Sequence, residues 1–266
     1  MRLTKHHGLG NDFLVLLDLT GTQPISAELA VALCHRRTGI GADGLIRVSR
    51  GADGADVTME LRNADGSVAE MSGNGIRCLA QAVFQAGVAE PPVLRVATAA
   101  GLRTVTALAR VDERTDRLSV EMGQAKVGAD EPEWVTGSVL RATRVDVGNP
   151  HLVLHWAEAS LPDRDELIAI GRRIDDLTPG GANTEIVRPG PAAGELAMVV
   201  YERGVGPTEA CGTGACATVA AAHHWKLSGP QATVHMPGGP VEITLGDPVV
   251  LTGDATSIAT IDAPWP

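Results

Sequence analysis

The sequence predicts an α/β fold made of two related halves, each built around one long buried helix. Two observations predict this fold. One set of landmarks occurs twice in the same order, and each set ends in a Gly-x-Gly segment that begins a helix. The chain has 266 residues, of which 44% are hydrophobic and 20% are charged, so it can bury the cores of two ordinary domains. Because only 3% of the residues are aromatic, those cores are aliphatic.

The repeat consists of four landmarks: a Gly-Asn turn before an apolar strand, a helical stretch, a polar residue at the end of a strand, and a helix start. Nine residues separate the third landmark from the fourth in both copies, and the spacing from the first to the fourth differs by a single residue. Chance rarely gives this agreement, so we interpret the chain as a duplicated unit. The landmarks are Asn11, Arg36-Arg37, Asn63 and Ser72 in the first copy, and Asn149, Arg172-Arg173, Glu202 and Cys211 in the second.

Local patterns predict the elements of the first half. Residues 26–37 have apolar positions at helical spacing, and Ser26 is a suitable N-cap. Residues 57–61 alternate as a strand before an Asn-Ala-Asp-Gly turn. An apolar stripe starting at residue 72 predicts a helix that ends at Gly87, a C′ glycine.

The second half follows the same plan, with a strand over residues 198–201 and a helix over residues 215–225. That helix is small and apolar on all sides, which is typical of a buried helix, so we expect each long helix to be wrapped by its own sheet. Residues 93–111 and 234–251 are predicted to be strand-rich closures of the two halves. The polar residues 112–116 are predicted to link the halves.

Composition excludes several classes of protein. The formal net charge of −10 argues against a nucleic-acid partner, and no apolar stretch is long enough to span a membrane. The first seven residues lack the apolar region of a secretory signal, so we expect a cytoplasmic protein with free thiols. No His or Cys spacing suggests a metal site. The histidines without a visible partner are interpreted as surface or helix-end residues, and they are His6, His7, His223 and His224.

Both predicted helix starts place a Ser or Cys directly before Gly-x-Gly: Ser72 before residues 73–75 and Cys211 before residues 212–214. The N–H groups of a first helical turn have no intrahelical partner, and the helix dipole adds positive potential there. Such an end binds carboxylates and is expected to lower the pKa of a thiol. One such start is ordinarily an N-cap and a tight turn. The paired occurrence favours a reaction site.

Several segments together resemble the signature of the diaminopimelate epimerase family. They extend over nearly the whole chain, and in combination they are specific, whereas one Gly-x-Gly is not. The segments that carry the resemblance are residues 8–13, 37–44, 63–67, 73–77, 148–151, 201–206 and 209–215.

The resemblance implies an α/β (α+β) fold of two pseudo-symmetric domains, each a mostly antiparallel sheet or barrel wrapped around a central helix, with the active site in the cleft between them. It also implies that the C-terminal tail returns to the first domain. We therefore expect a first domain of residues 1–113 with residues 255–266, and a second domain of residues 114–254.

The family interconverts LL- and meso-diaminopimelate without pyridoxal phosphate or another cofactor, for lysine and peptidoglycan synthesis. The resemblance implies a two-base mechanism in which groups at positions 72 and 211 act on opposite faces of the α-carbon. Glu202 and His151 are further acid–base candidates, and Arg203 is the candidate for the distal carboxylate. His151 and the asparagines are, on their own, equally compatible with capping turns. The predicted substrate contacts are Asn11, Gly44, Asn63, Gly73, Asn74, Asn149, Asn183, Glu202, Arg203, Gly212 and Thr213.

Position 72 departs from the family pattern, which has a cysteine there. A thiol has a reference pKa of about 8.5, whereas a serine hydroxyl needs a strong neighbouring base. Cys78 lies roughly 9 Å further along the predicted helix and does not replace it. Three interpretations stay open: an engineered Cys→Ser variant that holds substrate, a natural epimerase in which Ser72 protonates weakly, or one-base chemistry that uses Cys211 alone.

Two alternatives remain beside diaminopimelate epimerase. One is a different amino-acid racemase or isomerase on the same fold. The other is a non-catalytic amino-acid-binding protein, which would bind substrate without exchanging its α-proton. The expected partner is a small amino acid, and a homodimer is one arrangement that the sequence leaves open.

Overall fold

The computed structural model describes residues 1–69 and 71–264. Contacts within the chain define two units, Met1–Glu121 with Thr252–Pro266, and Met122–Leu251. The chain passes from one unit to the other within strand β7 (Thr115–Gly123) and again within strand β16 (Val249–Asp262). The linker predicted at residues 112–116 is wrong, because these residues form the turn of a hairpin that enters β7, with Asp112 accepting the N–H of Thr115 at 2.9 Å.

The first unit is an eight-stranded barrel around a helix. Its strands pair in the order β1-β2-β3-β4-β5-β6-β7-β16, and β16 pairs back onto β1, which closes the ring. The pairs β2–β3 and β4–β5 are parallel, whereas β1–β2, β3–β4, β5–β6, β6–β7 and β16–β1 are antiparallel. The remaining elements are β1 (Arg2–Gly8), β2 (Asn11–Leu17), α1 (Ala27–Cys34), β3 (Gly44–Arg50), β4 (Val57–Asn63), α2 (Gly73–Gln85), β5 (Val93–Thr98) and β6 (Gly101–Arg110).

The second unit repeats this plan. Its strands follow the order β15-β14-β12-β11-β10-β9-β8, and the short strand β13 pairs with β12. The elements are β8 (Lys126–Asp130), η1 (Pro132–Trp134), β9 (Val139–Asp146), β10 (Pro150–Trp156), α3 (Arg164–Leu177), β11 (Asn183–Pro189), β12 (Glu195–Glu202), β13 (Gly206–Thr208), α4 (Gly212–His224), β14 (Gln231–Met236) and β15 (Gly239–Thr244).

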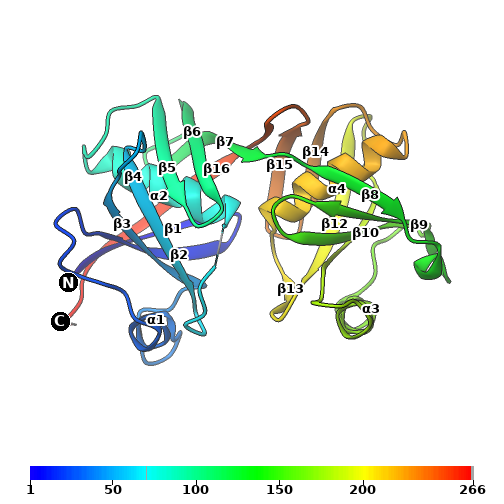
Figure 1. Cartoon of the computed structure of the whole chain (residues 1–266), viewed down its shortest axis with the longest axis horizontal. Helices are drawn as coiled ribbons and strands as arrows, with labels where there is room; N and C mark the ends of the chain where they lie inside the picture. Colours follow the sequence, from blue (N-terminus) through cyan, green and yellow to red (C-terminus); the bar gives the residue numbers. More distant parts are fainter. Residues whose placement is uncertain (70, 265–266) are drawn as a thin grey trace. The chain divides into compact units, whose positions relative to one another are not determined.

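The expectation that each long helix is wrapped by strands is confirmed. Figure 1 shows α2 and α4 each enclosed by the strands of its own unit. Eleven consecutive residues of each helix are buried, 73–83 in α2 and 212–222 in α4. In α4 most of these residues are Ala, Gly or Thr, and such small side chains let strands pack on every side of it.

The duplication extends to the strand pairing. In each unit a helix joins two parallel strands, α1 between β2 and β3 and α3 between β10 and β11. The joining helix covers the outer face of those strands in both units: Leu33 of α1 packs with Leu14, and Leu167 of α3 packs with Leu152. The α+β fold of two related units, which the sequence predicts, is confirmed.

His6 is one clear correction to the sequence interpretation. It is fully buried, not a surface residue, and its Nδ1 forms a 2.8 Å hydrogen bond with Oε1 of Gln81 on α2. Burial lowers its pKa. Gln81 in turn donates to the carbonyl of Ala255 at 2.9 Å, so this pair ties the central helix to β1 and to the closing strand β16.

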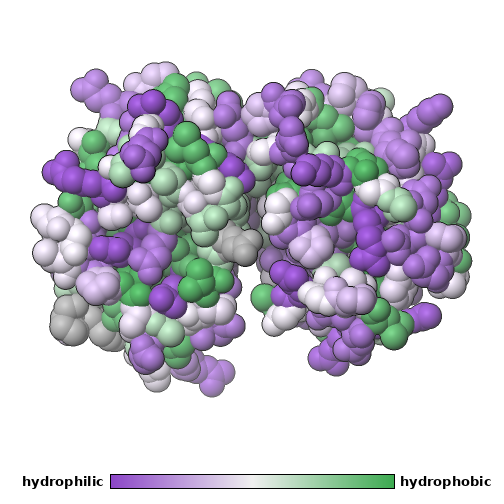
Figure 2. Space-filling view, viewed as in Figure 1, coloured by the Kyte–Doolittle hydropathy of each residue, from purple (hydrophilic) through white to green (hydrophobic). Residues whose placement is uncertain are grey.

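The visible surface of each unit is mostly hydrophilic, with apolar side chains scattered among polar ones (Figure 2). Among the residues that the structure describes, no helix is long and apolar enough to cross a membrane.

Candidate active site

Ser72 is the N-cap of α2. Its backbone is extended, with φ −140° and ψ 118°, and its Oγ accepts the N–H of Gly75 at 3.0 Å. Gly73 and Asn74, the first two residues of the helix, are buried. The serine therefore satisfies one of the unpaired N–H groups of the first turn.

Cys211 is the N-cap of α4 in the same conformation. Its φ and ψ are −128° and 114°, and its Sγ accepts the N–H of Gly214 at 3.4 Å. The hydroxyl of Thr213 lies 3.5 Å from the same sulfur. Positions 72 and 211 are thus equivalent in backbone conformation, in hydrogen bond and in place within the repeat.

The environment of Cys211 overturns the expectation that the helix start lowers its pKa. Burial raises the pKa of this thiol well above its usual value, and the carboxylates of Glu202 and Glu185 raise it further. The contacts from Thr213 and Gly214 act in the opposite direction but are weaker. The surroundings of Cys211 therefore favour its protonated thiol over the thiolate. Cys34 and Cys78 are also buried, and burial raises the pKa of each to about 12.

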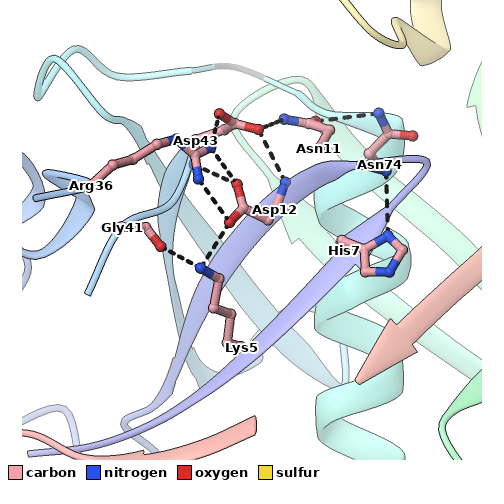
Figure 3. A network of polar contacts seen from close by, with 9 residues as sticks. Lys5, His7, Asn11, Asp12, Arg36, Gly41, Asp43 and Asn74 are labelled. Atoms are coloured by element: carbon pink, nitrogen blue, oxygen red, sulfur yellow. Dashed lines mark hydrogen bonds and ion pairs between the residues drawn. The ribbon is translucent and has the colours of Figure 1, made fainter. Parts of the chain in front are cut away.

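In the first unit, two of the predicted contact residues touch each other at the start of α2. Nδ2 of Asn74 donates to Oδ1 of Asn11 at 3.2 Å, and Nδ2 of Asn11 donates to Oδ2 of Asp43 at 2.9 Å (Figure 3). The carboxylate of Asp43 thereby fixes which way the Asn11 amide faces.

Behind Asn11 lies a charged network that the sequence interpretation missed. Asp12 accepts from Lys5 Nζ at 2.9 Å and from Arg36 at 2.7 Å, and Arg36 also reaches Asp43 at 2.7 Å (Figure 3). Burial opposes the charge of Asp12, but these two cations outweigh it and lower the pKa of Asp12. The signal in the sequence was position alone, since Asp12 and Asp43 each sit inside a segment of the family resemblance.

Gly44 and Asn63 face each other across β3 and β4. A Cβ at Gly44 would lie 2.9 Å from the carbonyl oxygen of Arg62 and 3.1 Å from the ring of Phe13, so this position requires a glycine. Nδ2 of Asn63 donates to Oγ of Ser67 at 3.0 Å, within the turn that follows β4. Much of the Asn63 side chain therefore serves the turn.

In the second unit, the predicted residues His151, Asn149 and Thr213 form one connected set. His151 Nε2 lies 3.0 Å from Asn149 Oδ1, and Asn149 Nδ2 donates to Thr213 Oγ1 at 3.4 Å. The other ring nitrogen of His151 lies 2.8 Å from Oε1 of Glu185, a fully buried carboxyl group that we did not predict. The available signal was weak: a glutamate directly before the β-branched apolar residues Ile186 and Val187.

Asn183, Arg203 and Glu202 also gather in the second unit. Asn183 Oδ1 accepts the backbone N–H of Arg203 at 3.0 Å, and its Nδ2 donates to the carbonyl of Pro150 at 3.2 Å. The guanidinium of Arg203 donates to the carbonyl of Gly180 at 2.9 Å. Glu202 accepts the hydroxyl of Thr208 at 2.5 Å. Asn183 thus holds the ends of two strands together and places Arg203.

Solved structures of several epimerases and isomerases share this fold. A hydroxyproline epimerase from Agrobacterium vitis with bound trans-4-hydroxy-L-proline superposes with a TM-score of 0.72 at 18% identity, covering 98% of this chain and 90% of that one. A predicted epimerase from Pseudomonas aeruginosa gives 0.72 at 14% identity, covering 100% and 99%. A methylitaconate-delta-isomerase gives 0.64 at 12% identity, covering 100% and 98%. The fold is therefore one that epimerases and isomerases use.

Sequence relatives define the family more narrowly. The family model described as diaminopimelate epimerase matches residues 3–128 and 143–258. The diaminopimelate epimerase of Desulfitobacterium hafniense is 38% identical over 278 residues, covering 97% of this chain and 96% of the relative. That of a Synechococcus strain is 42% identical over 253 residues, covering 90% and 88%. The chain belongs to the diaminopimelate epimerase family.

Proposed function

We propose that this protein is an isomerase that interconverts LL- and meso-diaminopimelate by moving protons at the α-carbon. One observation carries the proposal: Ser72 and Cys211 occupy the same N-cap position in two copies of one unit. Inversion of a stereocentre needs an acid and a base on opposite faces of the carbanion, and a duplicated helix start supplies one group for each. The proposal places the enzyme in the cytoplasm, in the supply of lysine and peptidoglycan precursors.

The chemistry needs no pyridoxal phosphate. The α-carboxylate is held by N–H groups at the two helix starts, at Gly73, Asn74, Gly212 and Thr213, and the dipoles of these helix ends stabilise the charge that develops in the carbanion. The surroundings of Cys211 favour its protonated form, so in this proposal it is the group that protonates the carbanion. The reverse direction requires Cys211 as thiolate.

Recognition of the second amino-acid head is assigned to the second unit. Arg203 can hold the distal carboxylate with two parallel hydrogen bonds, and Asn183 places it. Glu202 is the group for the ammonium. Asn11, Gly44, Asn63 and Asn149 are proposed to complete the binding site. Neighbouring amides that are already oriented bind a ligand at low entropic cost, and the contacts of Asn11 and Asn149 give that orientation.

The serine at position 72 favours a slower reaction than two thiols would give. Its hydroxyl already accepts the N–H of Gly75, and among the described residues no carboxylate or imidazole forms a hydrogen bond with its Oγ. Abstraction of a proton by this group is therefore weak. This residue also gives specific support to a second candidate, a one-base isomerase or exchange reaction carried by Cys211 alone.

Proton exchange in D₂O tests the proposal and separates these candidates. The protein is incubated with LL- or meso-diaminopimelate, and the α-deuterium content and the isomer ratio are followed by NMR. An epimerase incorporates deuterium from both isomers and drives both toward one ratio. Exchange without any change in the isomer ratio would indicate one-base chemistry. Binding of both isomers without exchange, in the protein and in Ser72→Cys alike, would reject catalysis.

A further inference from the structure

An unbroken series of hydrogen bonds leads from a buried carboxyl group to the sulfur of Cys211. Its members are Glu185, His151, Asn149, Thr213 and Cys211, which we name the Cys211 series, and its four steps measure 2.8, 3.0, 3.4 and 3.5 Å in that order. The side chains of His151 and Glu185 have no exposed surface at all.

The fold itself does not require this polar pair. In the first unit, Phe13 pairs with Gly44 across the parallel strands β2 and β3. In the second unit, the equivalent pair across β10 and β11 is His151 with Asn183. Two residues further along, Ile46 stands where the second unit has Glu185. A Cβ on Gly75 would meet Ile46, and a Cβ on Gly214 would meet Glu185, so the two side chains contact equivalent helix positions.

The first unit therefore fills both positions with apolar side chains and keeps the same fold. A buried His–Glu pair contributes little stability compared with such apolar packing. Its presence beside Cys211, and its absence beside Ser72, points to a role in the chemistry of the thiol.

The hydrogen-bond partners give a direction to each step of the Cys211 series. The Asn149 carbonyl oxygen can only accept, so Nε2 of His151 carries a proton. Nδ1 faces a carboxyl oxygen, so a second proton lies between Nδ1 and Oε1 of Glu185. Thr213 already accepts from Asn149, which leaves its single hydroxyl proton for the sulfur of Cys211. A donated hydroxyl stabilises a thiolate more than a thiol, and the sulfur of a protonated Cys211 accepts it as well.

Loss of one proton from the pair reverses the series. Nε2 of His151 would then accept, and the Asn149 amide would turn to offer its NH₂ group. Its oxygen would face Thr213 and accept the hydroxyl proton, so Thr213 could only accept the S–H of Cys211. This direction suits a thiol. No proton has to pass through the amide for the two states to interchange.

We propose that Glu185 and His151 form a proton-holding pair that sets, through Asn149, whether Thr213 donates to or accepts from Cys211. Glu185 is then a positioning residue for the thiol. The benefit of this arrangement to catalysis rests on the proposed function. The second carboxyl oxygen of Glu185, Oε2, is buried and has no hydrogen-bond partner among the residues described, so the contact with His151 is the hydrogen bond that holds this carboxyl group. The carboxylates that act on the sulfur are Glu185 on β11 and Glu202 on β12, and His151 on β10 contacts Glu185.

A double-mutant cycle separates this mechanism from a simple effect of charge. The variants are Glu185→Gln, Thr213→Val and the double variant, and the readout is the alkylation rate of Cys211 by iodoacetamide across pH 6–9, followed by peptide mass spectrometry. If Glu185 acts on Cys211 only through its charge, Glu185→Gln changes the alkylation rate equally with and without the Thr213 hydroxyl. If it acts through the hydrogen-bond series, its effect requires that hydroxyl.

The proposal predicts that the fold-change in alkylation rate caused by Glu185→Gln depends on Thr213. The fold-change measured with Thr213 present should differ more than threefold from the fold-change measured in the Thr213→Val background. It also predicts that Thr213→Ser behaves like the unsubstituted protein. Factors that agree within threefold would overturn it, because charge alone would then explain the effect. Glu195→Gln is the matched control, since Glu195 pairs with His235 at 3.4 Å in the same unit, outside the Cys211 series.

Two further points keep the test decisive. If Glu185→Gln fails to fold, the double variant His151→Phe/Glu185→Ile takes its place in the cycle. This variant puts at both positions the side chains that the first unit has there, Phe13 and Ile46. The alkylation assay uses no substrate, so its outcome is independent of the proposed function. If the double-mutant cycle shows the predicted dependence on Thr213 but no α-proton exchange is found, the epimerase proposal is rejected and the role of the Cys211 series stands. If exchange is found but the cycle shows no dependence on Thr213, only the role of the Cys211 series is rejected.

Discussion

The side chains at positions 72 and 211 fill the same structural place and differ in acidity. Each accepts the N–H group three residues further along, through oxygen in one unit and through sulfur in the other. The cap is therefore a property of the repeat, whereas the proton chemistry is a property of the single atom at each position.

This distinction predicts that Cys211→Ser separates stability from activity. A serine hydroxyl caps a helix well, so the free energy of unfolding should change by less than about 1 kcal/mol. Exchange of the α-proton should fall below detection. The two are measured by urea unfolding and by NMR in D₂O, and a variant that retained exchange would show that Cys211 is not the acid–base group.

Asp18 gives a second prediction at this scale. Its fully buried carboxylate accepts hydrogen bonds from Arg47 and from the N–H groups of Gln23 and Thr22. Burial opposes the charge, but these donors outweigh it and lower the pKa of Asp18 to about 2. Because the folded-state pKa is lowered, the stabilisation is complete above the unfolded value near 3.9 and is lost as the pH falls toward 2.

Asp18→Asn should therefore lower the free energy of unfolding at pH 7 by about 2 kcal/mol, since it weakens charged hydrogen bonds to Arg47. It should also flatten the decline of stability between pH 4 and pH 2. Unfolding by urea at several pH values measures both. An unchanged slope would show that other carboxylates dominate acid unfolding.

The first turns of α2 and α4 show how one element differs between its two copies. A Cβ at Gly214 would lie 2.5 Å from Oε1 of Glu185, whereas a Cβ at Gly75 would meet Ser72 and Ile46 at 3.2–3.3 Å. The second copy therefore has no room beside its carboxyl group.

Gly214→Ala should accordingly displace Glu185, lower stability by about 1–3 kcal/mol and alter the reactivity of Cys211. Gly75→Ala is the matched variant, and it should cost less because its neighbours Ser72 and Ile46 need to shift by only a few tenths of an ångström. Thermal unfolding of the two variants compares them. Equal losses would contradict the close packing of Glu185 on α4.

Helices that local sequence patterns mark could be predicted from the sequence, but their first and last residues were predicted less accurately. The C′ glycine of α2 is confirmed, since Gly87 has a φ of 66° directly after the cap. The helix predicted to reach Arg37 ends at Cys34, because Nδ1 of His35 accepts the N–H groups of Arg37 and Thr38 and turns the chain. The helix α4 begins three residues before the predicted Ala215, because burial overrides the low helix propensity of its glycines.

Pairs of residues far apart in sequence were beyond prediction. His6 meets Gln81 and His151 meets Glu185 only because strand pairing brings them together, and no local pattern encodes the partner. The family resemblance supplied the names of candidate residues but not their contacts. The structure shows, for example, that the side chain of Asn63 donates to the Ser67 hydroxyl and that of Asn183 to the Pro150 carbonyl.

At the scale of the whole molecule, the last strand closes the first barrel. Residues 256–262 of β16 pair with β1, and the terminal amine of Met1 donates to the carbonyl of Ala263 at 2.8 Å. Segments from the beginning and the end of this sequence thus complete one unit.

Deletion of residues 255–266 should therefore open the barrel and lower the melting temperature by about 10 °C or more, because it leaves two strand edges unpaired. Ile258→Thr is the control, since this side chain is exposed in the same strand and its replacement should shift the midpoint by less than about 2 °C. A truncated chain with unchanged melting would contradict the closing role of β16.

The equivalence of positions 72 and 211 is tested most directly by Ser72→Cys. The measurement is the rate of α-deuterium incorporation and isomer interconversion with LL- and meso-diaminopimelate, in the protein and in this variant. A thiol at the α2 N-cap should raise both rates at least a hundredfold, because its reference pKa of about 8.5 lies far closer to neutrality than that of a serine hydroxyl. No gain in either rate, with the variant folded and binding both isomers, would contradict the assignment of position 72 as the second acid–base group.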